Sequence, residues 1–472
     1  MWLKQSRWSG VCLLVYLISG CHHTDLGYFA APATTEVQPR PTPDEISSLK
    51  PAAETQPQPT QLEKFQLPEF IAATVAYNMR LKVGMEQIHQ AHADYVTDSL
   101  IPNCQLFSDA QLLPLGPQDL LNQNGPPQYD AMLTVPIDWL LFGKRVAAME
   151  AARWQIDVKE ADQTDLVRKT VTQAVLLFYD YLEAKELLKV ANEDIIELQK
   201  LEALALKNVK EQIGKIDAER VRLAILDANR EQHRREAAVD SIKARLRTFI
   251  GRTGMDADFD VLGTIDVARA LPPLDLKGAL ELTRKRRPDL LSDERAITQS
   301  QAAIVKEESK KYPQVSIQTG FSYQDQVHIT GFPNATLFNI GLTTTLPFTD
   351  RNQGNILKAY SNLRASQGKL QADTADALAE VEGAVAVYRE AYEAVTNDDP
   401  ASLTKARDVL DHTLEAYQKG DKNILDMLDA VRAYRDRVRT MVSTKTDYWQ
   451  ALHTLNGAMG VVALDPAMAG KK

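Results

Sequence analysis

The feature that most constrains this chain is one long stretch, Lys144–Ile213, that contains neither glycine nor proline. Apolar side chains recur within it at intervals of three and four residues, as at Val171, Val175 and Phe178, which is the period of an α-helix. At 1.5 Å per residue the predicted helix is about 100 Å long. A helix so much longer than the usual ~8–20 residues indicates a coiled coil or the wall of a tube rather than part of a globular core.

The chain also contains an internal repeat. Segments of similar sequence recur about 206 to 211 residues apart, for example "AVLLFYDYLEA" and "AVAVYREAYEA". The paired positions are Pro102 and Pro313, Pro136 and Pro347, Tyr179 and Tyr388, Gly214 and Gly420, and Gly251 and Gly460. The steady offset indicates that one structural unit was duplicated.

Each copy is predicted to contain a helix, two short strands and two very long helices, which gives a mainly α fold with a small β portion. The first copy spans residues 63–251, with a helix at about 66–98, strands at about 101–138, and long helices at about 141–213 and 215–250. The second copy spans residues 252–462, with a helix at about 277–311, strands at about 312–347, and long helices at about 354–419 and 421–456, before a tail at 463–472. Gly214 and Gly420 mark the turns of the two helical hairpins. The segment Asn397–Ser402 is expected to interrupt its helix, either as a kink or as an offset.

The predicted strands of the second copy alternate between apolar and polar residues. In "QVSIQTGFSYQ", Ile317, Phe321 and Tyr323 fall on one face, with glutamine and serine on the other. Such alternation over about ten residues is typical of a membrane β-barrel, and it also fits an ordinary half-buried sheet. Four strands cannot close a barrel, and an open sheet edge in lipid leaves backbone groups unpaired. A membrane location would therefore require several copies of the chain to share one barrel.

The N-terminus has the pattern of a bacterial signal peptide. Lys4 and Arg7 precede a short apolar stretch that ends in "ISGC" at Cys21. This arrangement resembles a lipobox, which implies a signal peptide at residues 1–20, lipidation of Cys21 and an anchor in the outer membrane. An ordinary secretory signal, in which Cys21 has no role, is the alternative. Residues 21–62 are rich in proline and poor in aromatic residues, which predicts a disordered, lipid-anchored linker.

Composition argues against several other functions. The net charge of -9 disfavours nucleic acid as a partner. Cysteine and histidine are few and scattered, so neither metal-ligand spacing nor a cofactor is predicted. No nucleophile–base pair or phosphate-binding loop stands out, and long helices offer no concave site. We therefore expect no catalytic residue and no enzyme.

The duplicated plan, together with three short motifs, resembles the TolC family of outer-membrane efflux channels. The motifs are "VPIDW" (Val135–Trp139), "LPFTDRNQG" (Leu346–Gly354) and "YQKG…ILDMLDA" (Tyr417–Ala430), and the resemblance covers roughly residues 66–462. It implies a homotrimer in which a 12-stranded membrane β-barrel continues into a long periplasmic α-helical barrel. It also implies a passive exit duct, which receives substrates from an inner-membrane pump of the resistance-nodulation-division type through a periplasmic adaptor.

Two aspartates near the start of the last long helix are candidate gate residues. Asp426 and Asp429 are three residues apart and so share one helix face. By themselves they fit a solvated face, since one to two turns into a helix the dipole no longer favours acidic residues strongly. The resemblance implies instead that the pair forms rings of carboxylates at the closed periplasmic end, which would select for cations.

The resemblance also implies a latch that holds this end closed. Tyr417 and Lys422 match the latch positions that contact the neighbouring hairpin. The acidic partner expected after the first hairpin turn falls at Arg220, and Glu219 beside it is a possible substitute.

Two other functions remain open on the sequence. A periplasmic adaptor would be a coiled-coil protein that joins pump to channel without conducting, although it would carry one helical hairpin rather than two. A structural envelope lipoprotein would need neither alternating strands nor a charged helix tip. Both alternatives differ from a channel in making no pore.

Overall fold

The computed structural model describes residues 63–111, 127–207, 212–252, 259–327, 331–398, 400–462 and 464. The predicted signal peptide and linker, with Cys21, lie outside the described residues, as does the predicted tail apart from Leu464. Within the described part of the chain the fold is mainly helical with a small β portion. The predicted fold class is therefore confirmed.

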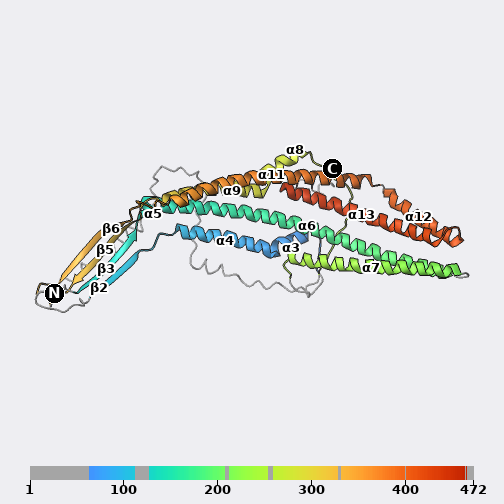
Figure 1. Ribbon diagram of the computed structural model, residues 1–472, viewed down its shortest axis with the longest axis horizontal. Helices are drawn as coiled ribbons and strands as arrows, with labels where there is room; N and C mark the ends of the chain where they lie inside the picture. The colour runs from blue at the N-terminus through green and yellow to red at the C-terminus, as the bar shows by residue number, and fades with distance from the viewer. Residues whose placement is uncertain are drawn as a thin grey trace. The chain divides into compact units, whose positions relative to one another are not determined.

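Five helices build two long hairpins in the described part of the chain, and one arm of the second hairpin consists of two helices that follow each other end to end (Figure 1). They are α6 (Lys144–Lys207), α7 (Gln212–Phe249), α11 (Gln353–Asn397), α12 (Pro400–Lys419) and α13 (Ile424–Met459). α6 packs against α7 and α13, and α13 also packs against α11 and α12. The two hairpins therefore meet through α6 and α13. None of the helices among the described residues is both long enough and apolar enough to cross a bilayer.

A pair of shorter helices precedes the strands in each repeat, where a single helix was expected. The pairs are α3 (Leu67–Tyr77) with α4 (Met79–Ser99), and α8 (Leu276–Arg286) with α9 (Pro288–Ser309). The breaks fall at Asn78 and Arg287, which have nearly the same backbone angles (φ -66° and ψ 119°; φ -71° and ψ 121°). Asn78 caps α4 by accepting from the Arg80 N–H at 2.9 Å, and Pro288 disfavours helix in the residue before it. The duplication is thus visible in the backbone itself.

The four predicted strands form one antiparallel sheet in the order β2-β3-β5-β6. Their bounds are β2 (Gln105–Gln111), β3 (Gln128–Pro136), β5 (Val315–Gln324) and β6 (Ala335–Thr344). β3 pairs with β5, so the sheet joins the two repeats, and the short helix α5 (Asp138–Leu141) leads from β3 towards α6. A separate parallel pair joins β1 (Glu63–Phe65) and β4 (Phe259–Val261).

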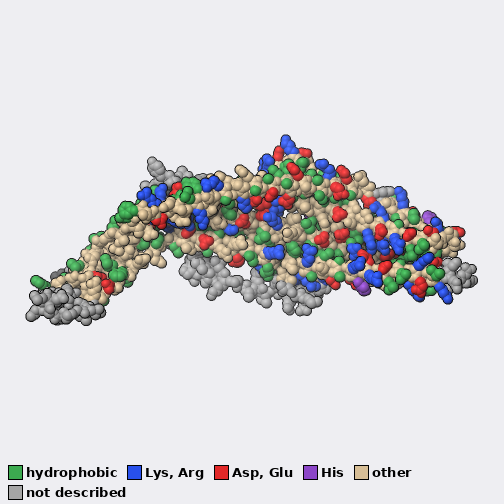
Figure 2. Space-filling model, in the orientation of Figure 1, with side chains coloured by type: hydrophobic (Ala, Val, Ile, Leu, Met, Phe, Trp, Pro, Cys, Tyr) green, Lys and Arg blue, Asp and Glu red, His purple; other side chains and the backbone are tan. Residues whose placement is uncertain are grey.

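The two faces of the four-stranded sheet differ as the alternation predicts. One face carries exposed apolar side chains, including Phe321 opposite Phe338 and Ile317 opposite Leu342. On the other face polar side chains bond to one another, as where the Asn339 amide donates to the Ser322 hydroxyl at 2.6 Å. Figure 2 shows hydrophobic and uncharged surface over the strands, with charged side chains gathered over the helices.

Three of the long helices are followed by a glycine in the left-handed backbone conformation. Gly251, Gly420 and Gly460 all have positive φ (68°, 84° and 74°), a conformation that side chains with a Cβ rarely adopt. After Gly420 the chain forms a Schellman motif, with the Gly420 N–H bonded to the Tyr417 carbonyl and the Asp421 N–H to the Ala416 carbonyl. Gly214 differs from the expectation that it forms the first hairpin turn, because α7 begins at Gln212 and includes it.

Candidate functional site

The candidate site is the tip where α12 turns back into α13. Asn423 caps α13, since its side chain accepts from the Asp426 N–H at 2.9 Å. The apolar residues that follow, including Ile424, Met427 and Leu428, are buried. They belong to a group that we call the tip cluster, which draws on α6, α7, α12 and α13 and comprises Ile195, Leu198, Leu201, Val221, Ala228, Leu410, Tyr417, Ile424, Met427, Leu428, Ala430 and Val431. The tip cluster therefore joins the two hairpins.

Asp426 lies in the first turn of α13, closer to the helix start than the sequence suggested. Its carboxylate accepts from the Asn423 N–H at 3.4 Å and completes a capping box. The Lys422 ammonium lies 3.9 Å from the same carboxylate. The expectation that Asp426 lies too far inside the helix to interact with its dipole was wrong, because the helix begins at Ile424. Asp426 thus helps to start the helix as well as carrying a charge.

Asp429 is the more accessible of the two gate candidates. Its side chain is 75 % exposed, compared with 41 % for Asp426. The Arg432 guanidinium, one turn further along, lies 3.3 Å from the Asp429 carboxylate. Since both carboxylates are on the surface of the same helix turn, Asp429 and Asp426 together place negative charge at the tip, partly offset by Arg432 and Lys422.

Tyr417 is buried in the tip cluster, but its acidic neighbour is neither of the residues that the sequence suggested. Burial raises the pKa of the Tyr417 hydroxyl, and the negative charge of Asp217 on α7 raises it further. Glu219 instead pairs with Arg222 at 2.8 Å, and Arg220 pairs with Asp217 at 3.6 Å. Arg220 is therefore a neighbour of the acidic partner and does not replace it.

The sequence contains a pattern that predicts Asp217 as the acidic neighbour of Tyr417. Asp217 precedes Val221, which is fully buried, by four residues, and residues four apart lie on the same helix face. An acidic residue on the buried stripe of α7 is expected to meet the opposite hairpin. It was missed because the resemblance placed the acidic partner at Arg220, three residues further along the chain.

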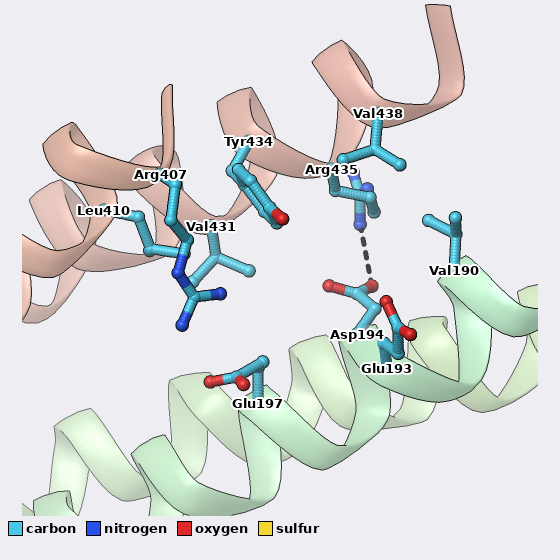
Figure 3. Close-up of a pocket in the computed structure, with 10 residues that line it drawn as sticks. All are labelled: Val190, Glu193, Asp194, Glu197, Arg407, Leu410, Val431, Tyr434, Arg435 and Val438. Carbon is cyan, nitrogen blue, oxygen red and sulfur yellow. Dashed lines mark hydrogen bonds and ion pairs between the residues drawn. The ribbon is translucent and has the colours of Figure 1, made fainter. Parts of the chain in front are cut away.

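A charged cavity lies above the tip cluster, between α6 and the α12–α13 hairpin (Figure 3). It has a volume of about 250 Å³. Asp194 of α6 and Arg435 of α13 point toward each other in it, with a Nη1–Oδ2 distance of 3.2 Å. Arg407 and Glu197 lie on opposite sides of the cavity (Figure 3). Burial lowers the pKa of Arg407, but the Asp411 carboxylate and, to a smaller extent, Glu197 outweigh it and raise that pKa. The hairpins are thus joined by apolar contacts at the tip and by ion pairs above it.

The described residues do not bring together a group of three or more His, Cys, Asp or Glu side chains that could hold a metal ion. What the tip offers is negative charge carried by surface carboxylates, on helices that are held together by a buried tyrosine and a cross-hairpin ion pair. Such an arrangement can attract cations.

Comparison with known proteins agrees with this architecture. Residues 279–461 match the family model described as outer membrane efflux protein. The cobalt-zinc-cadmium resistance protein CzcC of Cupriavidus metallidurans is 23 % identical over 335 residues, which cover 70 % of this chain and 76 % of CzcC.

Solved structures share the fold. The CmeC outer membrane channel of Campylobacter jejuni has a TM-score of 0.69 at 16 % identity, covering 85 % of this chain and 88 % of CmeC. The open state of the MtrE outer membrane channel of Neisseria gonorrhoeae has a TM-score of 0.64 at 17 % identity, and the match covers 84 % of this chain and 89 % of MtrE. The duplicated architecture, the family match over residues 279–461 and these structural likenesses confirm the resemblance found in the sequence: this chain is similar in sequence and in fold to outer membrane efflux proteins.

Proposed function

We propose that this protein is a passive, trimeric exit duct in the outer membrane, which receives substrates from an inner-membrane pump through a periplasmic adaptor. The pump would be of the resistance-nodulation-division type and would supply the energy. The duct itself would perform no chemistry and bind no cofactor. Its helical body would lie in the periplasm, and Cys21 would carry the lipid that anchors the N-terminus.

The observation that carries the proposal is the four-stranded sheet. β2 and β6 are its edge strands, and its exposed face is apolar, with Ile340 76 % and Leu342 65 % accessible. In a single copy the open edges leave backbone groups unpaired, which is costly in lipid, and the large apolar face is unfavourable in water. The edges would be satisfied if β6 of one copy paired with β2 of the next, so that three copies close a barrel of twelve strands, and lipid around that barrel would cover the apolar face.

The tip of the helices would be the periplasmic gate. Asp429, with Asp426 on the same face, would supply the ring of negative charge. Tyr417 beside Asp217 supports a latch between the hairpins, and Lys422 would reduce the charge of Asp426. Glu219 and Arg220 would act on the latch through their neighbours rather than by touching Tyr417.

The proposal is tested by single-channel recording of the purified protein in planar bilayers. We expect discrete, cation-selective openings from a trimer. A protein that is shown to be trimeric and inserted in the membrane, and yet never conducts with or without a co-reconstituted adaptor and pump, would instead support a structural lipoprotein. A protein that stays monomeric and outside the membrane would support an adaptor.

Lipid anchoring is tested separately. Labelled palmitate should be incorporated into the wild-type protein and lost in Cys21→Ser, with Cys104→Ser as the matched control because Cys104 is an exposed cysteine in the folded part of the chain. Label retained in Cys21→Ser would exclude this anchor while leaving the channel proposal in place.

A further inference from the structure

The long helix of the second repeat is broken, whereas its counterpart in the first repeat is continuous. α11 ends at Asn397 and α12 begins at Pro400, with Asp398 between them in an extended conformation (φ -63°, ψ 114°). α6 runs without a break from Lys144 to Lys207. Pro400 disfavours helix in the residue before it and lacks a backbone N–H. Figure 1 shows α12 departing from the line of α11, so the break is a kink.

One side chain from α13 bonds to both sides of this break. The Arg437 guanidinium donates to the Ser402 hydroxyl from Nε at 2.9 Å and from Nη2 at 2.6 Å. Nη2 also donates to the carboxylate of Asp398. Asp398 directly follows α11 and Ser402 lies in the first turn of α12. The side chains of Arg437 and Asp398 are each only 26 % exposed, so water competes weakly for these bonds.

The helix that carries Arg437 is well placed to fix the break. α13 is continuous from Ile424 to Met459 and packs against α6, α11 and α12. The residues two positions before and two positions after Arg437 both contact the first hairpin. Arg435 pairs with Asp194 of α6 at 3.2 Å, and Arg439 lies 3.6 Å from Glu231 of α7. α13 is therefore held to the first hairpin at the level where Arg437 holds the kink.

We propose that Arg437 is a positioning residue that sets the angle between α11 and α12 and thereby holds the tip closed. The 20 residues of α12 form a lever about 30 Å long between the kink and the tip. A change of about 10° at the kink would move the tip by about 5 Å on that length. Such a shift would withdraw Tyr417 from Asp217 and displace Asp429. The claim that this lever controls a channel gate rests on the proposed function, whereas the claim that Arg437 sets the angle of the kink does not.

The repeat supplies a matched control for Arg437. Arg230 lies on α7, and its offset from Arg437 falls within the range of the repeat. It is also an arginine on the second arm of a hairpin, yet its side chain is 74 % exposed and pairs at 3.2 Å with Asp227, itself 75 % exposed, on the same helix. Arg230→Ala removes the same side chain without touching a break.

The experiment compares Arg437→Ala, Arg437→Lys, Asp398→Ala and Arg230→Ala in the full-length protein. We expect Arg437→Ala to raise the open probability of single channels about tenfold, the effect of losing one hydrogen bond to a charged group. Arg437→Lys should recover part of the closure, because it keeps the charge near Asp398. Asp398→Ala should resemble Arg437→Ala, and the double variant should open no more than either single variant, as expected of residues that act through one contact. Arg230→Ala should behave as wild type.

Hydrogen exchange of the backbone amides of residues 401–419 provides a readout that needs no conductance. It should rise in Arg437→Ala and not in Arg230→Ala, while exchange in α6 stays unchanged. If the wild type conducts and Arg437→Ala matches Arg230→Ala in both readouts, the positioning role is overturned. If no form conducts, the channel proposal fails and the exchange result alone decides on Arg437. Should Arg437→Ala fail to assemble, Asp398→Asn and Ser402→Ala decide by the same criteria.

Discussion

Arg435 of α13 donates to Asp194 of α6 at 3.2 Å, and the Asp194 side chain is only 5 % exposed. This ion pair joins the two hairpins above the tip cluster. Removing Asp194 leaves the Arg435 charge, which is only 25 % exposed, with the surface carboxylate of Asp436 as its remaining partner, and losing one partner of a buried pair is destabilising. We therefore predict that Asp194→Ala lowers the free energy of unfolding by about 2–4 kcal/mol, measured by urea denaturation at fixed protein concentration.

Asp436, whose carboxylate also contacts Arg435, provides the control. Asp436 lies 3.3 Å from the Arg435 Nε, but its side chain is 64 % exposed. Asp436→Ala should change the free energy of unfolding by less than about 1 kcal/mol. Equal losses in the two variants would show that burial of Asp194 does not matter to the pair.

The two glycines assigned to the hairpin turns should respond oppositely to alanine. Gly420 has φ 84°, and an added Cβ would meet no other atom within 4 Å, so Gly420→Ala suffers from backbone strain alone, at about 1–2 kcal/mol. Gly214 lies inside α7, where alanine is favoured over glycine by about 0.5–1 kcal/mol. Thermal denaturation of Gly420→Ala and Gly214→Ala should therefore shift in opposite directions. Destabilisation by both would place Gly214 in a turn.

Long helices and alternating strands could be predicted because each depends on a local pattern. The stretch from Lys144 lacks any residue that ends a helix, and the alternation around Phe321 fixes which side chains share a face. The position of Gly214 could not be read in this way, because glycine is tolerated inside helices as well as in turns. The repeat suggested a turn by analogy with Gly420, and the two copies differ at this point.

The contacts between hairpins were harder to predict than the hairpins themselves. Tyr417 and Asp217 lie 200 residues apart in the sequence (417 minus 217), and which residue of α7 meets α12 depends on the rotation of the helix about its axis. A difference of two residues, as between Asp217 and Glu219, moves a side chain to another face, whereas Arg220 shares the face of Asp217 and pairs with it. The Arg437 bridge was invisible for the same reason, although the break that it spans was expected from Pro400.

Ion selectivity should depend more on Asp429 than on Asp426. Asp426 completes the capping box of α13 and lies near Lys422, whereas Asp429 is more exposed and is offset only by Arg432 at 3.3 Å. Asp429→Asn should lower the cation preference of reconstituted channels. Arg432→Ala should increase it, since the guanidinium no longer offsets the carboxylate. Reversal potentials in a salt gradient measure both effects.

The same charge removal at a neighbouring aspartate tests whether Asp429 lies at the pore. Asp421→Asn, on the exposed turn between α12 and α13, removes one negative charge close by and serves as the control. Equal effects of Asp421→Asn and Asp429→Asn would indicate a general surface potential instead of a ring at the constriction.

His453 should make the protein less stable in acid. Its ring stacks on Tyr179 at a centroid distance of 5.4 Å, and its Nε2 is buried without a hydrogen-bond partner among the described residues. Burial lowers the pKa of His453 from 6.5 to about 4. The unfolded chain therefore binds a proton more readily than the folded one between these values. The stability associated with neutral His453 is complete above pH 6.5 and falls as the pH drops towards 4, by about 3 kcal/mol in total.

The measurement is the difference in free energy of unfolding between wild type and His453→Gln at a series of pH values. Glutamine cannot titrate, so this difference should change by up to about 3 kcal/mol between pH 7 and pH 4, in the direction that makes wild type relatively less stable in acid. His412→Gln, at an exposed position on α12, should follow the wild-type profile. Because other groups such as Glu183, whose pKa is raised by burial, titrate equally in both proteins, they cancel from the difference. Parallel profiles for wild type and His453→Gln would mean that the imidazole is protonated as easily in the folded protein as in the unfolded chain, and that the gap between α6 and α13 admits water.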